Sequence, residues 1–143
     1  MARKQQGVGE QLSFALYGAA GRVTRLHKPL LEPLGLTFPQ YLVILNLLDG
    51  APQTVGELGS RLGMDPGTLT PLLKRLQVAG MVTRTRDLDD ERRVLVDLTD
   101  ASRAIEREIR AVNGQIKAAC QLTEAQIQSL CKTLEGLAHP APE

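Results

Sequence analysis

Residues 54–80 read TVGELGSRLGMDPGTLTPLLKRLQVAG, and this stretch decides the fold. Thr54 is a favourable N-cap for a short helix over residues 55–62, with Glu57 at the third helical position as in a capping box. Gly63 follows the last apolar residue of that helix and is typical of a helix C-terminus. The first half of the stretch therefore predicts one short capped helix and a glycine-containing turn.

The second half of the stretch predicts another helix. Asp65 supplies a capping carboxylate, and Pro66 fits the first helical position because it needs no N–H partner there. The helix is expected to end near Gly80, and Pro71 removes one of its backbone hydrogen bonds. Four leucines recur on its inward face: Leu69, Leu72, Leu73 and Leu76. Two short helices joined by such a turn predict a helix-turn-helix.

After Gly80 the pattern changes to that of strands. Residues 81–86 and 93–98 are rich in β-branched side chains and are separated by the polar turn DLDDER. This pattern predicts a two-stranded hairpin with a charged tip, which is a wing appended to the helix-turn-helix.

The flanking segments are helical. An amphipathic helix is expected over about residues 9–28, ended by Pro29, Pro33 and Gly35. Thr37 is a good N-cap for the next helix, which is apolar nearly all round and so is expected to be buried. Beyond the hairpin, a long helix is expected from Thr99 or Asp100 to about Ala119, and a last helix from Thr123.

The composition is that of a single globular domain. The chain has 143 residues, of which 43% are hydrophobic and 23% charged. Aromatic residues make up 3% and tryptophan is absent, so an aliphatic and mainly helical core is expected. No apolar run approaches the roughly 18 to 20 residues of a membrane span, and MARKQQGVGEQLSF lacks the apolar centre of a secretion signal. Two cysteines are too few for a disulfide framework, and a cytoplasmic location follows as the default.

Charge is unevenly distributed along the chain. The formal net charge is +1, yet residues 74–86 hold four basic side chains and no acid. Such a segment beside a helix-turn-helix favours binding to double-stranded DNA. The candidate DNA contacts are Gly67, Thr68, Thr70, Lys74 and Arg75 on the second helix, Arg84 and Arg86 on the first strand, and Asp90 and Arg92 in the wing turn. In this interpretation Arg92 enters a minor groove while Asp90 holds its guanidinium; the alternative is a plain surface ion pair.

Three segments carry a family resemblance: LSFALYGAAGRVTRLHKPLLEPLGLTFPQYLVIL (12–45), GTLTPLLKRLQVAGMVTRTR (67–86) and DERRVLVDLT (90–99). They resemble the MarR family of winged-helix regulators, and within it the organic-hydroperoxide-sensing OhrR branch. The resemblance implies a homodimer with intertwined helices over about residues 9–35 and 100–138, and a winged helix-turn-helix over about residues 37–98. It also implies a pseudo-palindromic operator and repression that is relieved by an inducer.

The sequence departs from that branch at its sensor. The branch places a reactive cysteine where this chain has Ser13, and a serine hydroxyl cannot follow the oxidation chemistry of a thiolate. The two tyrosines that bind the sensor cysteine in the branch align with His27 and Phe38. Three altered positions around one site favour natural divergence, and the alternative is an engineered Ser13. The simplest role for Ser13 is that of a small polar side chain on a buried helix face.

A small-molecule site is expected in place of the redox trigger. Its candidate residues are Ser13, Tyr17, His27, Phe38 and Tyr41. The nearby cations Arg22, Arg25 and Lys28 favour a small aromatic or anionic inducer; the alternative is that these three charges simply face solvent.

Two other interpretations remain open. Cys120 and Cys131 are candidates for a redox-responsive regulator, although Cys131 lies between leucines and is expected in the core. A ligand- or partner-binding helical dimer without a DNA function belongs to a different class. No metal site is expected, since the only histidines are His27 and His139, and no cofactor motif or nucleophile arrangement suggests an enzyme.

Overall fold

The computed structural model of the chain describes residues 7–142. Residues 1–6, which begin the stretch searched for a secretion signal, lie outside the described residues. The elements in chain order are η1 (Val8–Glu10), α1 (Leu12–Leu31), η2 (Glu32–Leu34), α2 (Phe38–Asp49), β1 (Gln53–Thr54), α3 (Val55–Leu62), α4 (Pro66–Val78), β2 (Val82–Arg86), β3 (Val94–Leu98), α5 (Asp100–Ala104), α6 (Glu106–Cys120) and α7 (Glu124–Ala138).

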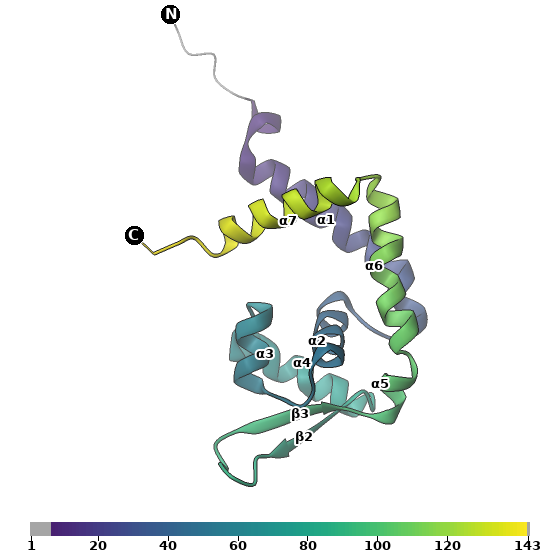
Figure 1. The fold of residues 1–143 in the computed structure, drawn as a ribbon, viewed down its shortest axis with the longest axis vertical. Helices are drawn as coiled ribbons and strands as arrows, with labels where there is room; N and C mark the ends of the chain where they lie inside the picture. The colour runs from purple at the N-terminus through teal and green to yellow at the C-terminus, as the bar shows by residue number, and fades with distance from the viewer. Residues whose placement is uncertain (1–6, 143) are drawn as a thin grey trace, which may run out of the picture.

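The elements form two parts (Figure 1). Helices α2, α3 and α4 and the sheet make up a winged-helix body. Helices α1, α6 and α7 make up a helical arm, and α5 lies where the chain passes from the wing to the arm. The mainly helical fold with a hairpin wing is confirmed.

Both helices of residues 54–80 form as the sequence predicts. Thr54 Oγ1 accepts the Glu57 N–H at 3.1 Å, and Asp65 Oδ1 accepts the Thr68 N–H at 2.8 Å. Gly63 adopts φ +64° between the helices, a left-handed conformation that glycine tolerates without strain. Only half of the predicted capping box is present, because the Glu57 carboxylate faces Arg93, at 3.7 Å, instead of the backbone of Thr54.

The sheet has one more strand than predicted. The hairpin of β2 and β3 is confirmed, and its antiparallel register pairs Arg84 with Val96. Strand β1 adds to the other edge of β3, so the strand order is β1-β3-β2. Because β1 has only two residues, it carries no alternating pattern that the sequence could reveal.

Two predicted helix boundaries are wrong. Pro29 lies inside α1, which continues to Leu31; burial of Leu31, only 1% exposed, offsets the single hydrogen bond that the proline removes. The helix expected over residues 100–119 is broken at Ile105, where φ −105° and ψ 16° leave the helical region. No glycine or proline marks this break, so the sequence carries no signal for it.

The core is aliphatic, as the composition predicts. The four inward leucines of α4 are buried and belong to one cluster with buried residues of α2, α3, the sheet and α6. Helix α7, in contrast, has no buried residue. No single helix within residues 7–142 is long and apolar enough to cross a membrane. Among these residues, the helical segments 12–34 and 38–49 reach that length and apolar character only when taken together, and the chain bends by 71° between them.

Candidate nucleic-acid interface

The exposed face of α4 carries the residues predicted to contact DNA. Thr68, Lys74 and Arg75 are exposed on this face, and Thr68 lies in the first turn, where free backbone N–H groups favour a phosphate. Gly67 is also exposed, and a Cβ at this position would lie 3.2 Å from Asp65 Oδ1. The glycine therefore makes room for the capping carboxylate.

Thr70 differs from the other residues predicted on α4. It is half-buried and lines a cleft of about 410 Å³ between the start of α3, the middle of α4 and the base of the wing. We call this the arginine cleft, since its lining includes three arginines; it consists of Thr54, Val55, Gly56, Thr70, Leu73, Arg84, Arg92, Arg93 and Val94. The cleft brings Thr70, Arg84 and Arg92 together, as an anion-binding surface requires.

Arg92 is presented to solvent by Asp90. Its Nε and Nη2 donate to the two carboxylate oxygens of Asp90 at 3.1 and 3.3 Å, and its backbone N–H donates to Oδ1 at 3.1 Å. The Arg92 side chain is nevertheless 91% exposed. These hydrogen bonds, the side-chain ones first, lower the pKa of the Asp90 carboxyl from its ordinary value. The predicted pair therefore forms, and it aims a free guanidinium edge outward from the wing.

The other predicted wing arginines are already engaged within the chain. Arg84 Nε donates to Gln77 Oε1 at 2.8 Å, which connects β2 to the end of α4. Arg86 Nη1 donates to the Glu91 carbonyl at 2.7 Å and so closes the wing turn. Both arginines help to position the interface, in addition to any contact with DNA.

Arg93 is a site residue that the sequence-based prediction missed. Its guanidinium lies 3.7 Å from Glu57 of α3 and 3.7 Å from Asp87 in the wing turn, and it lines the arginine cleft. Its place directly after Arg92 was visible in the sequence, but its proximity to α3 depends on how the wing folds back.

The five residues predicted for an effector pocket separate into two groups in the single chain. Ser13 and Tyr17 are exposed in the first half of α1, and Tyr17 is 81% exposed. His27, Phe38 and Tyr41 meet where α1 crosses α2. Ser13 and His27 lie 14 residues apart on one helix, which corresponds to about 21 Å along its axis. One chain alone therefore does not bring all five together.

His27, Phe38 and Tyr41 form a compact aromatic cluster. The His27 ring centroid lies 4.6 Å from that of Phe38 and 5.8 Å from that of Tyr41. His27 Nδ1 lies 2.8 Å from the Val23 carbonyl oxygen, so Nδ1 carries the proton of this hydrogen bond. Burial raises the pKa of the Tyr41 phenol.

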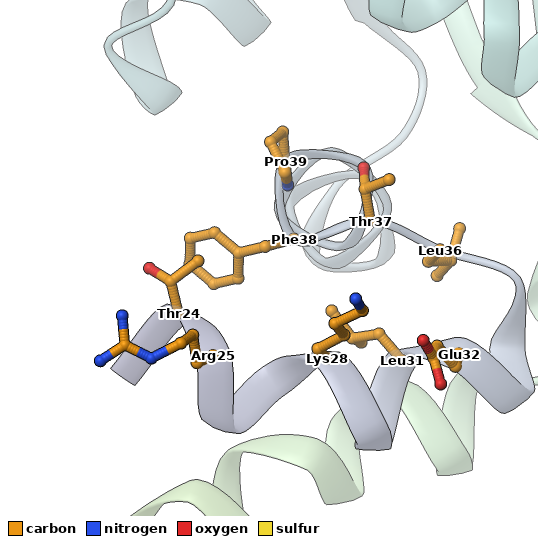
Figure 2. Close-up of a pocket in the computed structure, with 9 residues that line it drawn as sticks. All are labelled: Thr24, Arg25, Lys28, Leu31, Glu32, Leu36, Thr37, Phe38 and Pro39. Atoms are coloured by element: carbon orange, nitrogen blue, oxygen red, sulfur yellow. The ribbon is translucent and has the colours of Figure 1, made fainter. Parts of the chain in front are cut away.

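A cavity of about 480 Å³ lies beside this cluster, between the second half of α1 and the start of α2. Figure 2 shows Phe38 projecting over Thr24, and the Lys28 side chain extending into the space between the helices. The lining residues are Thr24, Arg25, Lys28, Leu31, Glu32, Leu36, Thr37, Phe38 and Pro39. The lining is mostly apolar and holds two cations, Arg25 and Lys28, against one carboxylate, Glu32, so it suits a small amphipathic anion.

Both cysteines are free, and one prediction for them is wrong. Cys120 is half-buried and packs against the core, whereas Cys131, expected in the core, is exposed. The difference arises because α7 packs against no core of its own chain. In residues 7–142, acidic, cysteine and histidine side chains form no group of three placed to hold a metal ion.

Comparison with known proteins agrees with this geometry. Residues 34–93 match the model of the MarR family. The organic hydroperoxide resistance transcriptional regulator of Bacillus subtilis is 37% identical over 127 residues, which cover 89% of this chain and 86% of that protein. The HTH-type transcriptional regulator TtmR of Methylorubrum extorquens is 40% identical over 132 residues, covering 92% of this chain and 68% of that protein.

A solved structure extends the agreement to three dimensions. The structure of reduced AbfR bound to DNA matches with a TM-score of 0.77 at 28% identity, and the match covers 94% of each chain. The overall fold is thus shared with a protein that was solved in complex with DNA. This chain belongs to the MarR family and is a DNA-binding transcriptional regulator.

Proposed function

We propose that the chain is a homodimeric repressor that binds a pseudo-palindromic operator and is released by a small-molecule inducer. The observation that carries the DNA contact is the arginine cleft beside the exposed face of α4. We infer a non-enzymatic role in the cytoplasm, where such an operator lies.

The proposed contacts follow from which groups are free. Helix α4 enters the major groove, where Thr68 in its first turn and Lys74 and Arg75 further along meet phosphates and base edges. Arg92 enters the adjacent minor groove, because the narrow groove attracts an exposed guanidinium. Thr70 and Arg84 in the arginine cleft bind the intervening backbone phosphates.

Two apolar surfaces support the homodimer. Four leucines of the α7 region are exposed although they recur at helical spacing: Leu122, Leu130, Leu134 and Leu137. Leu12, Phe14 and Tyr17 are exposed at the start of α1. Large apolar residues gathered on unpartnered helices mark an interaction surface, and a second copy offers the same helices in return.

The cavity of Figure 2 is the proposed inducer site. Arg25 and Lys28 bind a carboxylate, while Leu31, Leu36 and Phe38 contact the ring that carries it. The cavity lies between the helical arm and the winged-helix body, so a ligand there contacts both parts. Titration of benzoate and 4-hydroxybenzoate by calorimetry tests this: Arg25→Gln should weaken binding, and Arg22→Gln, which alters an arginine outside the lining, should not.

DNA binding itself is tested by fluorescence anisotropy with the DNA upstream of the gene. We expect tight binding by the reduced protein, and a steep fall of log K with log salt because bound counterions are released. Lys74→Gln should reduce that salt slope by about one. Binding that is weak and independent of salt would instead favour a ligand- or partner-binding dimer.

The same assay addresses a redox mechanism, which the Bacillus subtilis relative makes relevant. Ser13 lacks a thiol, so we expect organic hydroperoxide to leave the complex intact. Release by hydroperoxide and recovery with a thiol reductant would identify Cys120 or Cys131 as the sensor. The variants Cys120→Ser and Cys131→Ser would then show which of the two is responsible.

A further inference from the structure

Three charged side chains connect the winged-helix body to the helical arm. Arg110 of α6 donates from Nη1 to Asp49 Oδ1 at 3.1 Å and from Nε to Glu106 Oε1 at 2.9 Å. Asp49 is the last residue of α2 in the body, 61 residues from Arg110 in the sequence. Glu106 lies one helical turn before Arg110 on the same helix. The guanidinium thus joins the two parts and also pairs with Glu106 on its own helix.

Asp49, the residue of this contact that belongs to the winged-helix body, precedes a turn that hydrogen bonds hold in place. Gln53, only 3% exposed, donates from Nε2 to the carbonyls of Gly50 at 2.6 Å and Asn46 at 3.2 Å. Asn46 Nδ2 in turn donates to Gln53 Oε1 at 3.1 Å. These partly buried hydrogen bonds involve residues before and after Asp49 in the sequence, and so they fix its backbone relative to the body.

The arm end lies just after the break in the helix at Ile105. On the body side of this break, Arg103 of α5 donates to Asp97 of β3 at 3.2 Å. On the arm side, Arg110 donates to Asp49. Beside Arg110, α6 packs on the core through Ile109 and other apolar side chains. Apolar burial is not directional, whereas a charged hydrogen bond prefers one geometry.

We propose that Arg110 is a positioning residue for operator binding: through Asp49 it fixes the angle at which the body leaves α6, and so the spacing of the two α4 helices in the dimer. The inference rests on the proposed homodimeric function. Figure 1 shows α6 leading from the joint at α5 toward α7, whose exposed leucines form the proposed dimer surface. A rotation at Arg110 therefore moves α4 relative to the dimer axis.

The contact is suited to orientation and contributes little to folding. The side chains of Arg110 and Asp49 are 43% and 62% exposed, and exposed ion pairs stabilise proteins only weakly. We expect Arg110→Gln to shift the melting temperature by no more than about 3 °C. Loss of this weak ion pair in both subunits should lower affinity for correctly spaced half-sites by about two- to fivefold.

The test measures affinity as a function of half-site spacing. The half-site sequence is first identified by mixing the protein with random DNA duplexes and sequencing the duplexes that it binds. Duplexes with two copies, separated in single base-pair steps, are then compared with a duplex holding one copy. We expect the parent protein to prefer one spacing. Arg110→Gln and Asp49→Asn should lose affinity there but bind neighbouring spacings and the single half-site as the parent does.

Glu106→Gln is the matched control. It removes the other carboxylate of the cluster and leaves the link between Arg110 and Asp49, so it should retain the parent profile. An unchanged spacing profile in Arg110→Gln overturns the proposal, as does an equal loss at every spacing and on the single half-site. A parent protein that binds paired half-sites no better than one overturns the homodimeric operator function itself, and with it the role of Arg110.

Discussion

Arg86 and Arg92 lie on the same hairpin, and the structure gives them different tasks. Arg86 is turned back onto the Glu91 carbonyl, whereas Arg92 is held along its Asp90 side and left open on the other. The sequence predicts both as DNA contacts, and it does not show that Arg86 is already engaged within the chain. The hydrogen-bond partners decide that Arg92 is the one free to contact DNA.

Arg92→Ala should weaken operator binding by about 1 to 3 kcal/mol, because the wing then has no cation to place in the minor groove. Anisotropy at fixed salt measures the change. Arg107→Ala removes the same charge from an exposed position on α6 and should leave affinity within about twofold. Unchanged binding in Arg92→Ala would remove the wing from the proposed interface.

The pKa of Asp90 offers a direct test in solution of the hydrogen-bonded pair of Asp90 and Arg92, which we call the clamp. Hydrogen bonds from Arg92 favour the carboxylate, so they lower this pKa, and the clamp persists until the pH falls through the lowered value. Carbon-detected NMR should therefore give Asp90 a lower midpoint in the parent protein than in Arg92→Ala. Equal midpoints would show that the pair does not form in solution.

At the scale of elements, the close approach of α3 to the turn depends on a missing side chain. A Cβ at Gly59 would lie 2.8 Å from the Met64 carbonyl oxygen, a backbone atom that cannot rotate away. Helix α3 therefore approaches the backbone of the following turn this closely only because residue 59 is glycine. Helical pattern and caps predict the helices, but not this contact.

Gly59→Ala should lower the free energy of unfolding by about 1 to 3 kcal/mol, since the backbone of the turn must shift. Gly56→Ala in the same helix is the control. Its Cβ would meet nothing closer than Thr54 Oγ1 at 3.9 Å, and alanine favours the helix by about 0.5 to 1 kcal/mol. Urea unfolding followed by circular dichroism distinguishes the two. If Gly59→Ala proved as stable as the parent, the turn would be looser than the structure shows.

At the scale of the whole molecule, one helix has no packing partner that buries its apolar side within the single chain. Helix α7 buries none of its residues, and exposed Leu130, Leu134 and Leu137 follow one side of it. The body, by contrast, has a closed core of leucine, valine and isoleucine. A second copy of the arm is the partner that the exposed leucines fit, and it would also bring two α4 helices to one operator.

Leu134→Glu should convert the dimer to a monomer, because it places a carboxylate in the proposed apolar interface. Light scattering should show the mass halve, and affinity for paired half-sites should fall by about tenfold or more as the second contact is lost. Gln128→Glu introduces the same group on another side of α7 and should stay dimeric. A Leu134→Glu variant that keeps the dimeric mass would contradict this interface.

The sequence by itself determined the helix-turn-helix, the hairpin and the clamp between Asp90 and Arg92. Each of these depends on neighbours within a few residues: Asp65 caps its own helix, and Asp90 reaches a side chain two positions away. Local geometry follows from local chemistry, so the pattern was readable without a structure. That Ser13 stands where the branch has its sensor cysteine follows instead from the family resemblance.

Only the tertiary structure decided the remaining features. The exposure of Cys131, the break at Ile105 and the placement of Arg93 beside Glu57 all depend on packing between elements. The contact between Arg110 and Asp49 spans 61 residues, and no periodicity relates such distant positions. These features arise because burial and charge pairing are satisfied across the whole fold, where distance in space is independent of distance along the chain.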